Sequence, residues 1–564
     1  MNKKLDKNKT IDTLKGLYGD EANGIYLGIE NLIEKYQSKI KNEVQPLNEK
    51  DAILITYGDN VQQEGVPHLK TLKKFVDTYC LPEINSTHIL PCFPYTSDDG
   101  FSVTDYYEID PDLGTWKEIG ELAETSSLMF DAVVNHMSKS SQWFQSYLAQ
   151  EEDYKDYFIA VNPEIDLSKV VRPRALPLLS PFKLKNGEEK HIWTTFSEDQ
   201  VDLNFESPKV FLAILDVLLH YTAKGAKFIR LDAIAFLWKE IGTNCIHLEQ
   251  THTIIKLYKE VIQTLTSNLY LITETNVPHK ENISYFGNGE DEADLVYNFT
   301  LAPLLVYSVM KEDVAILTNW ASSLQMPSNK VCFFNFTASH DGLGMRPLQG
   351  IIPDSEILDL AKRAEKHGGQ VGYKNNEDGS QSPYELNCNY LDLLSDSNES
   401  DDNRVAKMMI TQSLMVAFPG VPGIYFHSLV GSRNYYKGVE ESGIKRRINR
   451  EKLNFNSLEK ELNEKDSLRN RIYSSYKKIL SVRSNQKAFN PFGEATYAKL
   501  ANDKVFVIKR VYENDTIYAI YNFSSASQNI KSLSNTVFDL FANKDIKEDT
   551  WKLKPLSFYW LKVK

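Results

Sequence analysis

The stretch AKFIRLDAIAF, residues 226–236, combines the pattern of a buried β-strand with two charged side chains. Charged residues are rarely fully buried unless they are paired or take part in function. Successive side chains of a strand point to opposite faces, so Arg230 and Asp232 point the same way. The sequence therefore predicts a strand that presents a guanidinium group and a carboxylate together at its end.

Seven further short apolar runs flank this stretch, and helical segments separate most of them. They are AILITYGD (52–59), THILPCFPY (87–95), LMFDAVVNH (128–136), LYLITETN (269–276), DLVYNF (294–299), VCFFNFTASHD (331–341) and GVPGIYF (420–426). Strands that are apolar on both faces and alternate with helices predict a parallel sheet, and eight such units predict a (β/α)8 barrel. We therefore predict an α/β protein: a (β/α)8 TIM barrel with inserted subdomains and a C-terminal antiparallel β-domain.

The spacing of the runs predicts the domain organisation. Residues 1–50 are polar with one amphipathic stretch, so we expect a helical N-terminal extension. The catalytic barrel is expected over 51–487. Two gaps in it are too long for simple loops, which predicts an inserted subdomain at about 137–225 and a polar loop region at about 342–405. Close alternation of apolar and polar residues predicts the β-domain over 488–564.

Composition restricts the partners. The net charge is −12 and no basic patch dominates, which argues against nucleic acid and, more weakly, against anionic membranes. The five cysteines are scattered, without metal-ligand spacing or a disulfide framework. No apolar run approaches the ~18–20 residues that span a bilayer, and no apolar signal segment is present. We therefore expect a cytoplasmic protein without metal or other cofactor, a monomer or homodimer whose partners are small-molecule substrates.

Polar residues stand at the carboxyl ends of several predicted strands, and in such a barrel those ends form the one rim that carries the chemistry. In chain order they are Asp98, His136, Arg230, Asp232, Glu274, His340 and Asp341, with Arg446 after the eighth strand. Each alone has a structural interpretation: a turn or helix cap, a satisfied histidine or an ion pair between Arg230 and Asp232. Gathering so many charges at one rim for stability alone costs too much, which favours an active site.

Two carboxylates on neighbouring strands suit the cleavage of a glycosidic bond. Arg230 would keep Asp232 ionised, as a nucleophile requires. Glu274, in a drier pocket, would hold its proton longer and protonate the leaving oxygen. Carboxyl groups on neighbouring strands lie close together, which favours the retaining double displacement over inversion.

The motifs DAVVNH (131–136), FIRLDAIAF (228–236), ITETN (272–276) and FTASHD (336–341) resemble the four short motifs of the α-amylase-type glycoside hydrolase clan. This resemblance implies that Asp232 is the nucleophile, Glu274 the acid/base and Asp341 the transition-state stabiliser. It also implies a donor-glucose site made of Asp98, His136, Arg230, His340 and Arg446.

Longer segments resemble the sucrose phosphorylase subfamily of this clan, over about residues 51 to 450. They include YTSDDGFSVTDYYEIDPDLGTW (95–116), VRPRALPLL (171–179) and QVDLNFESP (200–208). The N-terminal extension and YELNCNY (384–390) look more like its glucosylglycerate phosphorylase branch. That branch implies a retaining glycosyltransferase that converts 2-O-α-glucosylglycerate and phosphate to α-glucose 1-phosphate and glycerate.

A phosphorylase needs a cationic pocket for phosphate. Arg174 matches the phosphate-contacting position of the subfamily, and Arg172 is a second candidate because a guanidinium group fits phosphate geometry. The loop 372–390 is expected on the acceptor side, and one cationic pocket could serve both phosphate and the glycerate carboxylate. The residues expected from this loop are Lys374, Gln381, Glu385 and Asn387.

Three alternative functions remain at this point. A sucrose or sucrose 6-phosphate phosphorylase differs only in the acceptor, and an amylase-type hydrolase would use water instead of phosphate. A catalytically silent binding barrel is disfavoured because Asp232, Glu274 and Asp341 are all present.

Overall fold

The eight predicted strands form one closed parallel barrel, which confirms the predicted fold class. The computed structural model describes residues 4–41, 45–174, 176–375 and 380–564. In order around the barrel the strands are β1 (Ile53–Thr56), β3 (Ser86–Ile89), β4 (Ser127–Ala132), β9 (Ala226–Leu231), β10 (Tyr270–Thr273), β11 (Leu295–Tyr297), β12 (Cys332–Asn335) and β16 (Val421–Tyr425). All neighbouring pairs are parallel, and β16 closes the barrel against β1.

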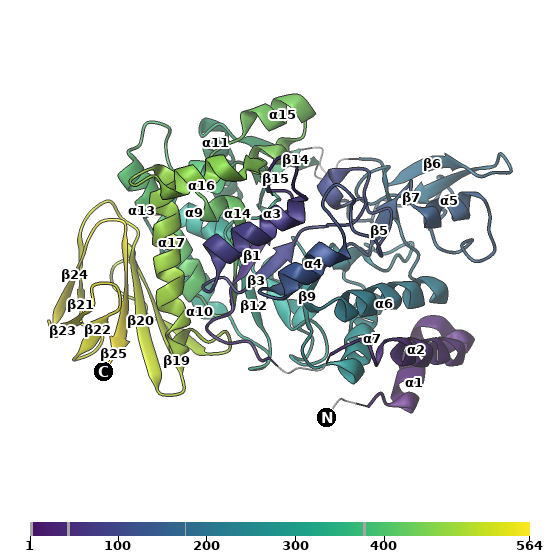
Figure 1. Cartoon of the computed structure of the whole chain (residues 1–564), viewed down its shortest axis with the longest axis horizontal. Helices are drawn as coiled ribbons and strands as arrows, with labels where there is room; N and C mark the ends of the chain where they lie inside the picture. The colour runs from purple at the N-terminus through teal and green to yellow at the C-terminus, as the bar shows by residue number, and fades with distance from the viewer. Residues whose placement is uncertain (1–3, 42–44, 175, 376–379) are drawn as a thin grey trace.

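Helices between the strands cover the outside of the barrel (Figure 1). The main ones are α3 (His68–Phe75), α4 (Trp116–Ala123), α6 (Pro208–Ala223), α7 (Glu249–Leu265), α9 (Leu301–Lys311), α10 (Ala315–Ser323), α13 (Asp401–Ala417) and α17 (Leu468–Ser484). Each residue of β9 is buried, because one face of the strand looks into the barrel and the other lies under helices. This double burial explains why the barrel strands appear in the sequence as continuous apolar runs.

Two insertions follow barrel strands and therefore leave from the carboxyl-end rim. The first follows β4 and contains β5 (His136–Ser138), α5 (Gln142–Leu148), β6 (Leu179–Lys183), β7 (Glu189–Trp193) and β8 (Gln200–Asp202). The second follows β12 and contains β13 (Leu343–Gly344), α11 (Asp354–Lys366), β14 (Gln370–Asn375), β15 (Gln381–Asn387) and α12 (Tyr390–Leu394). Strands β13, β15 and β14 form one antiparallel sheet in that order.

The chain after β16 passes back over the rim before α17. Its elements are α14 (Phe426–Leu429), α15 (Tyr436–Ser442), the 3-10 helix η7 (Lys445–Asn449), β17 (Leu453–Asn454) and α16 (Phe455–Asn463). Strand β17 pairs with β2 (Val61–Gln62), which follows the first barrel strand. This return path brings the arginine-rich segment of η7 to the rim.

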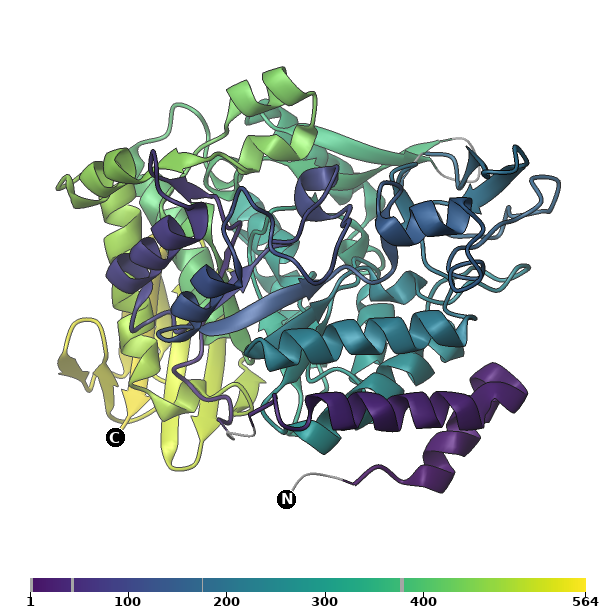
Figure 2. The ribbon, with the colours of Figure 1, turned by 45° about the vertical axis from the view of Figure 1, so that its right-hand side comes forward.

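The N-terminal extension folds into α1 (Lys7–Tyr18) and α2 (Ala22–Tyr36), which lie beside α6 and α7 (Figure 2). The Tyr18 hydroxyl donates to the backbone carbonyl of Phe205 at 3.0 Å. Gly28 faces Leu212 so closely that a Cβ there would lie 2.6 Å from a Leu212 methyl group, so a larger residue would require the Leu212 side chain to shift. The extension is thus on the outside of the barrel wall.

The C-terminal part is a six-stranded antiparallel sheet. Its strands, in spatial order, are β18 (Glu494–Tyr497), β19 (Val505–Tyr512), β20 (Asp515–Asn522), β25 (Ser557–Val563), β22 (Val537–Asp539) and β23 (Lys544–Ile546). A second pair, β21 (Gln528–Lys531) and β24 (Thr550–Leu553), accompanies it. The sheet packs on α13, where the Tyr521 hydroxyl donates to the Ser413 carbonyl at 3.1 Å. In the part of the chain that is described, no helix has both the length and the apolar character to cross a membrane.

Candidate active site

The carboxyl ends of the strands surround a cavity of about 90 Å³. Nine of the fourteen residues predicted from the sequence line it: Asp98, His136, Arg174, Asp232, Glu274, His340, Asp341, Glu385 and Arg446. Arg230 lies directly behind this lining. Ligand pockets usually measure about 300 Å³ or more, so this cavity is small for a disaccharide.

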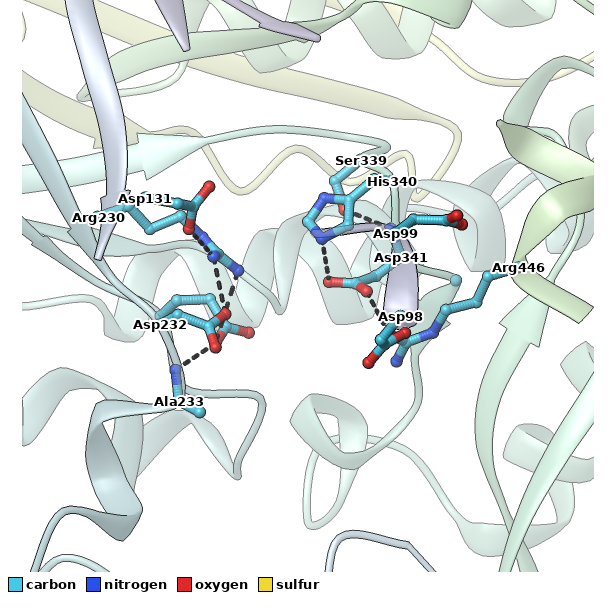
Figure 3. A network of polar contacts seen from close by, with 12 residues as sticks. Asp98, Asp99, Asp131, Arg230, Asp232, Ala233, Ser339, His340, Asp341 and Arg446 are labelled. Atoms are coloured by element: carbon cyan, nitrogen blue, oxygen red, sulfur yellow. Dashed lines mark hydrogen bonds and ion pairs between the residues drawn. The ribbon is translucent and has the colours of Figure 1, made fainter. Parts of the chain in front are cut away.

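Arg230 is fully buried and connects three neighbouring barrel strands (Figure 3). Its Nη1 donates to Asp131 of β4 and, at 2.8 Å, to Oδ1 of Asp232, directly after β9. Its Nη2 lies 3.7 Å from Oε2 of Glu274, directly after β10. Strand β9 therefore presents Arg230 and Asp232 together at its carboxyl end, with Glu274 as their neighbour.

The backbone after Asp232 turns sharply. Ala233 has φ 48° and ψ 30°, a left-handed conformation that is uncommon for a residue with a Cβ. Its N–H donates to Oε2 of Glu274 at 3.1 Å, which ties the two strand ends together. Strain of this kind concentrates at functional sites, where the surrounding structure enforces it.

The charges of Asp232 and Glu274 are coupled. Burial raises the pKa of both carboxyl groups above their ordinary values, and Arg230 opposes the rise in both. Arg230 contacts Asp232 directly and Glu274 only at the longer distance, so it stabilises the ionised form of Asp232 more. The expectation that Arg230 alone sets the charge of Asp232 is incomplete, because burial is the larger influence. Two coupled groups titrate as a pair.

Asp341 stands on the opposite wall with two basic partners. Arg446 Nη1 lies 2.6 Å from Asp341 Oδ1, and His340 Nε2 lies 3.4 Å from Oδ2. Burial acts to raise the pKa of Asp341, but Arg446, His340 and Arg450 together hold it well below its usual value. Asp341 is therefore an anion at neutral pH.

His340 is neutral and held by stacking. Burial lowers its pKa to about 3. Its ring stacks on Phe101 with centroids 4.8 Å apart and planes 4° from parallel. His136 is also buried, which lowers its pKa, and its Nε2 lies 2.9 Å from the backbone carbonyl of Phe101. Both imidazoles are thus fixed on the same short segment.

Phe101 directly follows the 3-10 turn η3 (Asp98–Gly100), in which Asp98 and Asp99 both have positive φ, 55° and 48°. Asp98 Oδ2 lies 2.9 Å from Arg174 Nη2. Asp99 instead pairs with Arg447 and Arg450. Figure 3 shows Asp98, Asp99, His340, Asp341 and Arg446 as one group facing the group around Arg230.

The other residues predicted for the acceptor side take several positions. Glu385 is buried, accepts from the Gly342 N–H at 2.8 Å and pairs with Arg446 at 3.0 Å. Asn387 is buried, while Gln381 is exposed. Lys374 is half-buried on β14. Arg172 is exposed, donates to the Leu176 carbonyl at 3.4 Å and is not part of the cavity wall.

Sequence reasoning missed several residues of the cavity wall. The polar ones are Gln200, Asn276 and Tyr384. Asn276 stands two positions after Glu274 in ITETN, so the strand period could have indicated it. Gln200 donates to Asp98 at 3.3 Å and comes from the inserted segment, where no periodic pattern pointed to it. Within the described ranges, no group of three or more His, Cys, Asp and Glu side chains could hold a metal ion.

Comparison with known proteins defines the family. The family model described as alpha amylase, catalytic domain, matches residues 82–342. A glucosylglycerate phosphorylase of Escherichia coli strain K12 is 42% identical over 560 residues, covering 99% of this chain and 100% of the relative. The chain belongs to the glucosylglycerate phosphorylase family. A second member, from Allomeiothermus silvanus, is 45% identical and covers 85% of this chain and 86% of its own.

The solved structures agree on the fold. The sucrose 6F-phosphate phosphorylase structure from Thermoanaerobacter thermosaccharolyticum superimposes with a TM-score of 0.73 at 24% identity, covering 84% of this chain and 94% of that one. The family relationship and this common fold both fit a barrel enzyme of the α-amylase type.

Proposed function

We propose that this glucosylglycerate phosphorylase family member converts 2-O-α-glucosylglycerate and phosphate to α-glucose 1-phosphate and glycerate, with retention at the anomeric carbon. The observation that carries the proposal is the arrangement of Asp232 and Glu274 next to the two terminal nitrogens of Arg230, in a cavity that also contains Arg174. The names of the two relatives at 42% and 45% identity support the choice of substrate.

In the first half of the proposed reaction, Asp232 attacks the anomeric carbon of the donor glucose. The bond from that carbon to the glycerate oxygen breaks, and Glu274 gives its proton to the leaving oxygen. Arg230 supports this division, because its direct contact favours the anion of Asp232 and leaves the proton of the pair on Glu274. The product is a glucosyl ester of Asp232.

Asp341 is proposed to stabilise the positive charge that develops on the sugar ring in both half-reactions. Arg446 and Arg450 keep it ionised, and it stands on the wall opposite Asp232. The donor glucose is proposed to contact Asp98, His136, His340 and Arg446, which line the same cavity.

In the second half, phosphate attacks the anomeric carbon from the side that glycerate has left. The ester bond to Asp232 breaks, Glu274 recovers a proton from the attacking phosphate, and two inversions give net retention. Arg174 is the proposed phosphate ligand, because its planar guanidinium group fits phosphate oxygens and it lines the cavity.

An acceptor screen in the reverse direction tests the proposal. The protein is incubated with α-glucose 1-phosphate and one of glycerate, glycerol, fructose or fructose 6-phosphate, and phosphate release is followed. Glycerate should give the highest kcat/KM. A higher value with fructose or its phosphate would assign a sucrose-type phosphorylase, and release that needs no acceptor would assign a hydrolase.

A further inference from the structure

The sheet β13–β15–β14 brings two cations together beside the cavity. The N–H of Met345 donates to the carbonyl of Tyr384 at 2.9 Å, which places the next residue, Arg346, along one side of β15. On the other side of β15, Lys374 pairs with Ser382. Arg346 and Lys374 therefore flank the same three-residue stretch of β15 from its two sides.

Among the described residues, neither of these cations has a carboxylate partner. The Nε of Arg346 is buried without a hydrogen-bond partner. Across the residues that the structure describes, neither Arg346 nor Lys374 forms an ion pair within 4 Å, although Asp354 at the start of α11 is near enough to act on Lys374. Burial and the positive charge of Arg346 lower the pKa of Lys374. The two positive charges repel each other, and within the described ranges no carboxylate pairs with either of them, so an anion bound here would be stabilised.

Tyr384 connects this pair with the catalytic groups. It lines the cavity together with Glu274, and it stands on β15 two residues after Ser382, at the bulge where the pairing of β14 with β15 shifts register between Gly372 and Tyr373. The charge of Arg346 and that of Glu274 both act on the Tyr384 hydroxyl. The cations thus stand on the side of the cavity that adjoins the proposed proton donor, where the leaving group departs.

A second unsatisfied polar atom faces the same region. Asn276 lines the cavity, and its buried Oδ1 has no hydrogen-bond partner. A Cβ at Gly344 would lie 2.6 Å from this oxygen, so β13 leaves the amide no room to turn away. An acceptor hydroxyl group could donate to it.

The other arginines that line or adjoin the cavity already have carboxylate partners. Arg174 pairs with Asp98, and Arg446 pairs with Asp341 and Glu385. An anionic ligand that approached either of these arginines, phosphate at Arg174 included, would compete with an aspartate or glutamate for it. Among the described residues, no carboxylate would have to be displaced before a ligand could pair with Arg346 or Lys374.

We propose that Arg346 and Lys374 bind the carboxylate of the acceptor, a small hydroxy acid, and leave Arg174 to phosphate. This inference rests on the proposed function and replaces one shared anion pocket with two. It assigns the discrimination between glycerate and neutral polyols to the sheet β13–β15–β14.

The test compares Arg346→Met and Lys374→Met with Lys362→Met. Lys362 is an exposed lysine of α11, the helix that packs on this sheet, so its replacement makes the same change of charge away from the cavity. Each variant is assayed with α-glucose 1-phosphate and either glycerate or glycerol. The phosphate KM is measured separately, with α-glucosyl fluoride as donor.

A charge-assisted hydrogen bond corresponds to roughly ten- to a hundredfold in affinity. Arg346→Met and Lys374→Met should each raise the KM for glycerate at least about tenfold, while the values for glycerol and phosphate move less than about twofold. Lys362→Met should change none of the three. Equal losses with glycerate and glycerol, or a phosphate KM that rises with that of glycerate, would overturn the assignment. Preference of the unmodified enzyme for fructose would instead reject the proposed function, before any variant is made.

Discussion

Arg174 Nη2 lies 2.9 Å from Asp98 Oδ2, so the proposed phosphate ligand and a proposed glucose ligand neutralise each other in the free protein. Burial acts to raise the pKa of Asp98, but Arg174, Arg446 and Arg450 hold it below its usual value. The pair spans the cavity wall and contributes to the small volume of about 90 Å³.

The first prediction is that Arg174→Gln raises the KM for phosphate at least about tenfold, because a charge-assisted contact is lost. The assay uses α-glucosyl fluoride and variable phosphate. Arg172→Gln is the control: it removes the same charge two positions earlier in the chain, and Arg172 is exposed and outside the cavity wall. This variant should raise the KM for phosphate less than about twofold. Equal effects of the two variants would remove Arg174 from the phosphate site.

The second prediction is that Asp232→Asn lowers kcat by at least about 10³-fold while the protein stays folded. The amide keeps the volume and the hydrogen bond to Arg230 but cannot form the glucosyl ester. Activity is measured by phosphate-dependent turnover, and folding by circular dichroism. Near-normal turnover in this variant would be incompatible with a covalent intermediate on Asp232.

The third prediction separates the acid from the nucleophile. Glu274→Gln should lower kcat/KM with glucosylglycerate by about 10²–10⁴-fold, because the leaving oxygen no longer receives a proton. α-Glucosyl fluoride needs no such proton, so it should still glucosylate Asp232, detected as a mass increase of the denatured protein. If fluoride and natural donor lose reactivity alike, Glu274 is not the acid.

The barrel, half of the residues that line the cavity and the pair of Arg230 with Asp232 were predictable from the sequence, whereas the ion pairs made by the insertions were not. Asp232 and Glu274 follow strands that double burial makes recognisable, and barrel geometry fixes where strand ends meet. Arg174 and Arg346 stand on segments without periodic pattern, so sequence alone could not say that one pairs with Asp98 and that the Nε of the other has no partner among the described residues. Long-range contacts of this kind depend on how the two insertions fold over the rim.

The fourth prediction follows from the burial of Glu274. Its pKa is raised in the folded protein, so its contribution to stability is complete below the unfolded pKa of about 4.3 and is lost as the pH rises through the folded pKa. Glutamine does not ionise, so the Glu274→Gln variant does not lose this stability as the pH rises. Its Tm should exceed that of the unmodified protein at pH 7, and the difference should disappear towards pH 4.

Calorimetry over this pH range measures the effect, with Glu494→Gln, a change at an exposed residue of the C-terminal sheet, as the control. The control should show no comparable difference in Tm at either pH. A lower Tm of Glu274→Gln at pH 7 would show that Glu274 stabilises the fold rather than strains it.

The last prediction concerns Asp131, which holds Arg230 from the side opposite Asp232. Its Oδ1 accepts from Arg230, and its Oδ2 lies 2.6 Å from Nε2 of His88. Removal of one partner from a buried ion pair costs about 3–5 kcal/mol, and a catalytic group displaced by 1 Å can lose about 10²-fold in rate. Asp131→Asn should therefore lower both the Tm and kcat. Because Arg230 supports the nucleophile, the loss of rate should appear with α-glucosyl fluoride as well as with glucosylglycerate, unlike the loss caused by Glu274→Gln. His88→Gln is the matched control: burial lowers the pKa of His88, so a neutral amide donor can replace the ring in its bond to Asp131, and the effect should be several times smaller. An Asp131→Asn enzyme that reacts normally with the fluoride would show that Arg230 does not need this anchor to serve Asp232.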